Sequence, residues 1–323
     1  IIALVEEAES VQAPVQKLAD KVAGWLIPVV LVFLIGVFLV TRDVSKIVTL
    51  LIFTSPAELG LATPLVMIAA IATTLGISFL RQFPGDLQVT LANYIAFLSQ
   101  PFLLKAAYQT MALGLVVTAI CVVLGYPVAW FLVKRDTRFR NAVFLIVLAP
   151  LLVSIVVRTV GWIIILGNEG LVNALLISLG VIDSSLQLMR SFWTVVVGLV
   201  HVLLPFMILS IASVLSKIDD DVIEAAMLLG ARPATAFLKI TLPMSMQGVA
   251  AGSIIVFALT IGTYLTPIWL GRGNVNVLAI SIHEQALISV EWSAAATSAV
   301  LLTIMALVFM AIFLASIRRM TRR

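Results

Sequence analysis

Charged residues are scarce in this 323-residue sequence: Asp, Glu, Lys and Arg together make up 11% of the chain, against roughly 25% in a typical soluble domain. Apolar residues make up 62%, and the mean hydropathy is +1.18. A soluble core cannot enclose that much apolar surface, so lipid must be the solvent of most of the chain. The composition excludes a soluble enzyme, a secreted disulfide-rich scaffold and a disordered binding segment.

Cysteine and histidine are scarce as well. The one cysteine, Cys121, lies in an apolar run, which excludes an intramolecular disulfide and a cysteine cluster for a structural metal. The two histidines, His201 and His283, lie far apart, and no Ser/His/Asp arrangement points to catalysis. The phosphate-binding string G-x-x-x-x-G-K-[ST] is also absent. We therefore expect neither enzyme activity nor a bound cofactor in this chain.

Long apolar runs are abundant, and seven of them are long enough to matter at about 20 residues per membrane crossing. They predict an all-α integral membrane protein, a polytopic helical bundle with about seven transmembrane segments. A shorter apolar run, Leu171–Ile182, is expected to lie as a helix at the outer interface. The seven segments are Trp25–Thr41, Ile47–Leu80, Leu104–Val133, Ala142–Leu166, Phe192–Leu215, Gly248–Leu270 and Ala295–Ile317.

Basic residues lie in alternate connections between the last five segments. They gather in the loops 134–141 and 216–247 and after residue 317, whereas the loops Gly167–Ser191 and Gly271–Ser293 hold one arginine each and several carboxylates. Because positively charged loops stay in the cytoplasm, the sequence predicts that both basic loops and the C-terminus are cytoplasmic. The net charge of +4 follows this membrane pattern and forms no single patch, so no nucleic-acid partner is expected.

The loop 216–247 has the sequence pattern of two short helices joined by a glycine. Asp219 and the two aspartates after it form an N-cap and an acidic first turn, and Gly230 is suited to end the first helix. Pro233 then starts a second helix. Such a hairpin outside the bilayer, with an apolar stripe and few charges, needs a protein partner to cover it. The alternatives are an ordinary connecting loop and a DNA-reading helix-turn-helix, for which only Arg232 and Lys239 supply basic side chains.

The same loop resembles the signature of a known family. Glu224-Ala225-Ala226, three residues, Gly230, nine residues, Ile240, one residue and Leu242-Pro243 match EAA-x3-G-x9-I-x-LP at every defined position. This is the EAA motif of type I (MetI-like) ABC-importer permeases. The stretches LANYIAFLSQPFLLKAAYQT, VLGYPVAWFLVKR and YLTPIWLGRGNVNVLA are most similar to the spermidine/putrescine branch of that family. The resemblance covers about residues 85–323.

The resemblance implies a permease domain at 85–323 that moves a small solute, polyamine-like by analogy, by alternating access in the bacterial inner membrane. Its loop 216–247 would be a coupling element docked on a cytoplasmic ATP-binding subunit, which would hold ATP and Mg²⁺. A second permease subunit, identical or different, and an extracytoplasmic solute-binding protein would complete the assembly in the lipid bilayer. The residues implied in coupling are Glu224, Ala225, Ala226, Gly230, Arg232, Ile240, Leu242 and Pro243.

Four polar or aromatic residues in the apolar segments are candidates for the solute pathway. Arg158 is either a side chain that snorkels to the outer face or a substrate contact. His201 either hydrogen-bonds a neighbouring helix or acts as a ligand. Trp162 and Tyr264 either line the pathway or anchor their segments at the interface.

Residues 1–84 resemble a different family. The stretch SPAELGLATP is similar to the metal-site helix of heavy-metal P-type ATPases, but Ala57 stands where that helix has a cysteine. No DKTGT phosphorylation motif accompanies it. Glu58 is therefore the one candidate metal ligand, with a protonated or partner-bound carboxyl as the alternative. These features predict a fusion of a P-type-ATPase-like membrane fragment with a permease. The rival interpretations are an ATPase fragment and a non-transporting fusion product.

Overall fold

A computed structural model describes residues 64–134 and 138–321, with side chains for 70–134 and 138–315. The chain divides into two compact units, residues 1–70 and 71–323. Only the last residues of the first unit are described, so the architecture below is that of the second. The predicted span Trp25–Thr41, the first half of the span Ile47–Leu80 and the candidate ligand Glu58 lie outside the described residues.

The described chain is helical, and its one β pairing is an isolated bridge between Leu80 and Val89. The helices are α4 (Pro64–Ser78), α5 (Ala92–Ser99), α6 (Pro101–Lys134), α7 (Arg140–Leu152), α8 (Ile155–Leu166), α9 (Leu171–Ser178), α10 (Phe192–Leu215), α11 (Asp220–Leu228), α12 (Pro233–Ala236), α13 (Leu242–Gly262), α14 (Leu265–Gly271), α15 (Leu278–His283) and α16 (Trp292–Thr321), with π-helical turns η2 (Phe237–Thr241) and η3 (Glu284–Ile288).

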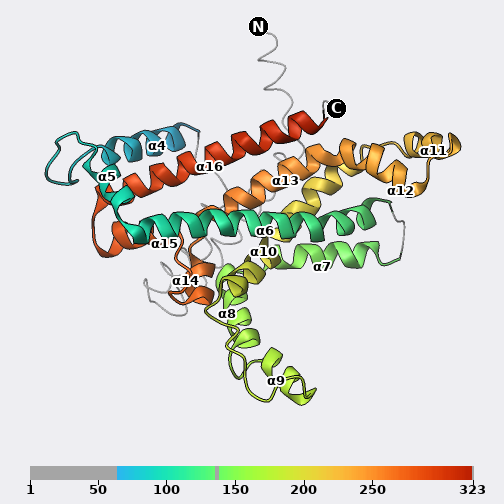
Figure 1. The fold of residues 1–323 in the computed structure, drawn as a ribbon, viewed down its shortest axis with the longest axis horizontal. Helices are drawn as coiled ribbons and strands as arrows, with labels where there is room; N and C mark the ends of the chain where they lie inside the picture. Colours follow the sequence, from blue (N-terminus) through green and yellow to red (C-terminus); the bar gives the residue numbers. More distant parts are fainter. Residues whose placement is uncertain (1–63, 135–137, 322–323) are drawn as a thin grey trace, which may run out of the picture. The chain divides into compact units, whose positions relative to one another are not determined.

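The centre of the bundle is a trio of long helices, α6, α10 and α13, which run alongside one another (Figure 1). The largest buried apolar cluster lies between them. Gly248 and Gly252, four residues apart on α13, allow this helix to approach α10 closely. A Cβ at position 248 would lie 2.8 Å from the carbonyl oxygen of Ser210 on α10, and one at position 252 would lie 2.7 Å from the sulfur of Met207. This small-xxx-small spacing lets the α10 and α13 backbones pack directly together.

Helix α16 covers this trio on one side, where it packs against α13, α5 and α15. The rings of Phe257 on α13 and Phe309 on α16 stack with centroids 4.1 Å apart. Helices α11 and α12 lie at one end of the bundle, and α5 and α15 lie at the other (Figure 1). An apolar surface remains exposed around the bundle, as expected of a helix assembly whose solvent is lipid.

The predicted segment Phe192–Leu215 is confirmed to the residue as α10. The single predicted span Ala142–Leu166 is wrong, because the structure breaks it into α7 and α8. Val153 and Ser154 both have extended backbones, with ψ of 134° and 140°, and the helix cannot continue through them. Pro150, just before the break, also withholds the amide that would bond one turn back.

The predicted span Gly248–Leu270 is likewise corrected at both ends. Helix α13 begins at Leu242 and stops at Gly262, and the chain turns at Thr263 before α14. The connection Gly271–Ser293 is not a simple loop, since it contains α15 and η3, and Leu278 of α15 is fully buried. A helix is confirmed after α8, but α9 ends at Ser178 rather than at residue 182.

By length and composition, five helical stretches within the described residues can cross a membrane. Of the two other predicted spans, Trp25–Thr41 and the first half of Ile47–Leu80 lie outside the residues described. The five are Pro101–Lys134, Ile155–Ser178, Phe192–Leu215, Pro233–Gly262 and Trp292–Ala315.

Candidate functional site

The loop after α10 folds into the two predicted short helices, α11 and α12. Asp219 is the N-cap of α11, and its carboxylate accepts the backbone N–H of Asp221 at 3.1 Å. Asp220 and Asp221 occupy the first turn, where negative charge is favourable at the positive end of the helix dipole. Pro233 is confirmed at the start of α12. The sequence signals for caps and breakers therefore set the local structure of this hairpin.

Gly230 makes the turn between the two helices with φ of +90°, a backbone conformation that L-residues rarely adopt. The turn is held by the N–H of Gly230 on the carbonyl of Met227 and by the N–H of Ala231 on the carbonyl of Ala226, each at 3.0 Å. The second of these bonds spans six residues, as in a Schellman cap. A Cβ at position 230 would meet nothing within 4 Å, so the backbone alone requires glycine here.

The tip of the hairpin is apolar and unprotected. Leu228 and Leu229 are 89% and 90% exposed, and Met227 is exposed beside them. Glu224, Ala225 and Arg232, which the motif implies in docking, are exposed as well, and Ala226 is half-buried. Two nearly bare leucines at the end of a helix are costly in water, which makes this tip a candidate contact for another protein.

The base of the hairpin, by contrast, is firmly attached to α6 through aromatic contacts. The ring of Phe237 in η2 meets the rings of Tyr126 and Trp130 edge to face, with centroids 5.7 and 5.3 Å apart. The hydroxyl of Tyr126 also hydrogen-bonds the hydroxyl of Ser245 on α13 at 2.8 Å. Each edge-to-face pair contributes about 0.5–1.5 kcal/mol beyond its area burial. The hairpin and the C-terminal half of α6 should therefore move together.

A second attachment joins α6 to the start of α11. Lys134 at the end of α6 donates to the carbonyl oxygen of Ile218 at 3.0 Å and forms an ion pair with Asp220. The Lys134 side chain is 11% exposed, while that of Asp220 is 67% exposed. Because an exposed carboxylate is well solvated, the ion pair adds little, and the lysine acts mainly by capping a buried carbonyl. The contact also brings the basic end of α6 to the same end of the bundle as the loop 216–247.

The last residues of the motif lie where the hairpin joins α13. Ile240 is half-buried within the π-helical turn η2, and Leu242 and Pro243 begin α13. The N–H of Leu242 bonds the carbonyl of Phe237, five residues back. Pro243 has no N–H for a bond four residues back, and widening the preceding turn accommodates its ring. The sequence contained the proline, but the π-helical turn was not predicted.

The pathway candidates separate into two groups. Trp162 on α8 donates its indole N–H to Nδ1 of His201 on α10 at 3.3 Å, and the rings meet edge to face. Arg158, one turn earlier on α8, donates to the carbonyl of Val153 at 2.6 Å. Tyr264 lies apart from them and stacks on His283, with ring centroids 4.9 Å apart. The pairing of Tyr264 with His283 was not predicted, because the two residues are far apart in the sequence.

Comparison with known proteins gives a consistent result. Residues 22–323 match the family described as binding-protein-dependent transport system inner membrane component. The chain is 32% identical over 233 residues to the spermidine/putrescine transport system permease protein PotB of Escherichia coli (strain K12), covering 71% of this chain and 84% of that one. PotB of Haemophilus influenzae is 28% identical over 267 residues, covering 83% and 92%.

Among solved structures, a bacterial ABC transporter involved in the import of the acidic polysaccharide alginate superposes with a TM-score of 0.63 at 17% identity, over 87% of this chain and 98% of that one. At that identity the likeness concerns the fold alone. The family match begins at residue 22 and so overlaps the stretch 1–84 that resembles a P-type ATPase. The comparisons give no support to that second resemblance.

Proposed function

The chain belongs to the family of binding-protein-dependent transport system inner membrane components, and from this premise we propose how it works as the permease subunit of an ABC importer. The hairpin α11–α12 is the lever through which a separate ATP-binding subunit moves the membrane helices. This chain hydrolyses nothing itself, and ATP and Mg²⁺ are bound by the partner subunit. The loops 134–141 and 216–247 and the C-terminus face the cytoplasm.

One contrast supports this proposal more than any other. The tip of the hairpin exposes Leu228 and Leu229 almost completely, while its base is clamped to α6 by Phe237 and Lys134. A lever needs a free end for a partner to grip and a fixed end that transmits the force. An ordinary connecting loop needs neither. Glu224, Ala225, Ala226 and Gly230 would then shape the gripped face, and Arg232 its rim.

The base of the hairpin continues without interruption into a membrane helix. The helical stretch runs from Pro233 through η2 to Gly262. A push on the tip would therefore tilt α13 and, through Phe237, the inner half of α6. Ile240, Leu242 and Pro243 lie at this junction, where the π-helical turn is the irregular point at which such a tilt can be absorbed.

The substrate we propose is a polyamine-like cation, on the strength of the two spermidine/putrescine permeases to which the chain is similar. The aromatic pair Trp162 and His201 is the part of the bundle suited to such a solute, because aromatic faces attract organic cations. Arg158 works against such a solute by its positive charge, and its half-buried guanidinium donates to the carbonyl of Val153 just before α8. A second permease subunit and an extracytoplasmic solute-binding protein complete the importer.

The test is reconstitution. The chain, co-expressed with its ATP-binding subunit and a second permease subunit, should co-purify with them and take up radiolabelled spermidine into liposomes only when ATP is hydrolysed. Leu228→Asp with Leu229→Asp should abolish co-purification, because two desolvated leucines contribute about 1.5–3 kcal/mol each. Leu179→Asp is the matched control: Leu179 is also exposed, at 67%, but follows α9. Full co-purification of the double variant would contradict the lever.

The division of the chain near residue 84 remains a hypothesis of its own. Residues 71–84 belong to the same compact unit as the permease helices. Ser78 hydrogen-bonds Tyr94 at 2.7 Å, and the hydroxyl of Thr297 donates to the carbonyl of Ser78 at 3.1 Å. Amplification of genomic DNA across codons 60–100 decides whether 1–84 is continuous with the rest in the cell. Failure to obtain a single product would identify an artificial join.

A further inference from the structure

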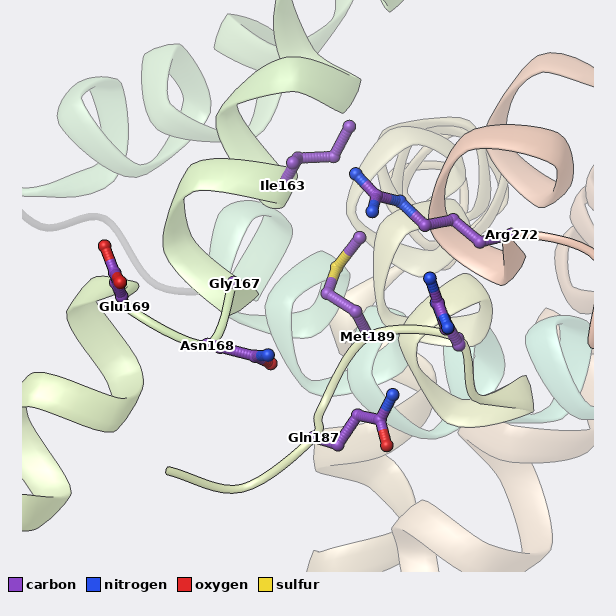
Figure 2. Close-up of a pocket in the computed structure, with 8 residues that line it drawn as sticks. Ile163, Gly167, Asn168, Glu169, Gln187, Met189 and Arg272 are labelled. Atoms are coloured by element: carbon purple, nitrogen blue, oxygen red, sulfur yellow. The ribbon is translucent and has the colours of Figure 1, made fainter. Parts of the chain in front are cut away.

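A pocket of about 490 Å³ lies beside the start of α10 (Figure 2). Three segments line it: the end of α8 with the turn after it, the irregular chain before α10 and the turn that ends α14. We call it the two-arginine pocket. Its lining residues are Ile163, Gly167, Asn168, Glu169, Gln187, Met189, Arg190 and Arg272.

The pocket is separated from the hairpin by the full length of α10. Arg190 lies two residues before α10 begins and Asp219 lies four residues after it ends. The 24 residues of α10 rise roughly 36 Å, more than the roughly 30 Å hydrocarbon core of a bilayer. If the hairpin is cytoplasmic, the two-arginine pocket therefore opens on the outer face of the membrane.

Both arginines are held in strained backbone conformations. Arg190 has φ of +66° and Arg272 has φ of +42°, although neither is glycine. Left-handed backbone at such residues costs about 1–2 kcal/mol each and persists only where the surroundings enforce it. Here the N–H of Arg190 bonds the carbonyl of Leu270 at 3.0 Å, and the side-chain amide of Asn274 bonds the carbonyl of Arg190 at 3.0 Å. These bonds tie the two arginine-bearing segments together.

The opposite wall is equally well built. Asn173, 1% exposed, donates its amide to the carbonyls of Gly167 and Leu186 and accepts the N–H of Leu186 at 2.9 Å. One buried side chain thus joins the turn after α8 to the segment that carries Gln187 and Arg190. Both the nitrogen and the oxygen of this amide are hydrogen-bonded to backbone groups, so the wall of the pocket is formed without a partner protein.

The charges in the pocket are unbalanced. Within the described chain, neither the guanidinium of Arg190 nor that of Arg272 takes part in an ion pair or a hydrogen bond. Figure 2 shows the guanidinium of Arg272 between the side chains of Ile163 and Met189, with Glu169 on the far side of the pocket and pointing away. A guanidinium flanked by apolar side chains is less hydrated than one in open water, which strengthens its bond to an anion.

We propose that the two-arginine pocket receives a carboxylate side chain of the extracytoplasmic solute-binding protein and so docks that protein on the permease. The inference rests on the proposed function. A cationic solute is repelled by two guanidinium groups, so the pocket is not a subsite for the polyamine. Two exposed forks with fixed backbones suit a carboxylate, which accepts bidentate bonds from arginine. The outward position of the pocket is where a binding protein arrives.

The experiment measures binding of the importer's own solute-binding protein to the complete transporter in lipid nanodiscs. The variants are Arg190→Gly and Arg272→Gly, which remove each guanidinium and leave a residue that tolerates positive φ, and the double variant Arg190→Glu with Arg272→Glu. Each glycine variant should raise the dissociation constant about 10- to 100-fold, which corresponds to the free energy of one charge-assisted hydrogen bond. The wild-type affinity should also fall with added salt, and that of the double variant should not.

Lys105→Glu is the matched control. Lys105 is exposed near the start of α6, at the same end of the bundle but outside the pocket, and Lys105→Glu changes net charge as much as a single arginine-to-glutamate change. It should keep the wild-type affinity. Co-purification with the ATP-binding subunits and the melting temperature establish that each variant is folded.

The outcomes separate the two proposals. If the wild-type transporter neither binds nor responds to the binding protein, the proposed function fails. If it does and the folded double variant binds equally well, the docking inference is overturned. Equal weakening by Lys105→Glu overturns it too, because the effect would then be one of general charge. The inference is also overturned if the arginine variants bind the solute-binding protein with unchanged affinity and the melting temperature falls only when phosphatidylglycerol is left out of the nanodiscs. That result would assign the pocket to a lipid headgroup instead.

Discussion

Gly230 offers the sharpest test of the lever, because backbone and side-chain effects separate there. Its φ is +90°, and a Cβ at this position would meet no atom within 4 Å of the chain. Substitution by alanine therefore costs the isolated permease only backbone strain. Steric effects of a larger side chain arise only when a partner lies against the tip.

The free-energy cost of a positive φ at this position can be compared with the stabilisation that the turn's hydrogen bonds supply. An L-residue in the left-handed region costs about 1–2 kcal/mol. The two backbone bonds that close the turn contribute about 0.5–1.5 kcal/mol each. Gly230→Ala thus removes about as much stability as one bond supplies, and the closed turn should become about 5- to 30-fold less populated relative to frayed forms. Asn tolerates this region better than other non-glycine residues, so Gly230→Asn should cost less.

The assay is ATP-driven solute uptake divided by ATP hydrolysis, measured on reconstituted complexes of the variants Gly230→Asn, Gly230→Ala, Gly230→Val and Gly230→Arg. If the bent turn is what matters, the ratio should fall in the order Gly, Asn, Ala, Val. If instead the partner needs the empty space, Ala should outperform Asn because it is smaller. That reversed order would refute the backbone argument, and wild-type uptake with Gly230→Arg would refute the coupling role altogether.

Further predictions concern the base of the hairpin, the helix contact and the orientation. Phe237→Ala should lower the ratio of uptake to ATP hydrolysis and destabilise the protein, by less than the roughly 3–5 kcal/mol of a fully buried phenylalanine because Phe237 is half-buried. Phe237→Leu should keep most of the stability but lose the ring contacts, and so should also lower the ratio; a wild-type ratio in Phe237→Leu would argue against the aromatic clamp. Gly252→Val should prevent assembly of a stable bundle, seen as aggregation on size-exclusion chromatography, because its Cβ meets Met207 at 2.7 Å; a monodisperse, active variant would contradict the close packing. Lys217→Cys should react with an impermeant maleimide only from the cytoplasm, and Asp183→Cys only from outside, because the basic loops are predicted to be cytoplasmic. The native Cys121 is buried and should give little background labelling. The reverse labelling pattern would mean that the bundle has the opposite orientation.

Local signals predicted the hairpin well. The N-cap at Asp219, the turn at Gly230 and the start at Pro233 all depend on a few neighbouring residues, and the structure has each of them. The ends of α10 were predicted for the same reason, since polar residues bracket a continuous apolar run. The roles assigned to the EAA residues, by contrast, remain predictions, because they concern a partner rather than this chain alone.

The hydropathy pattern predicted wrong helix boundaries where the backbone geometry interrupts an apolar segment. Pro127 and Pro205 lie inside unbroken helices, whereas α7 ends shortly after Pro150. No average over apolar side chains distinguishes these three prolines. The segment that forms α15 was overlooked because it is short and flanked by polar residues, and its burial depends on packing against α6 and α16.

By itself, the sequence determined that this is a helical membrane protein and that the hairpin α11–α12 bends at a glycine. These properties follow from composition and from residues a few positions apart. Only the tertiary structure decided that Phe237 clamps the hairpin to α6 and that Arg190 and Arg272 share a pocket. Such meetings join residues dozens of positions apart, and they depend on how helices pack, which one-dimensional patterns of hydropathy and charge do not encode.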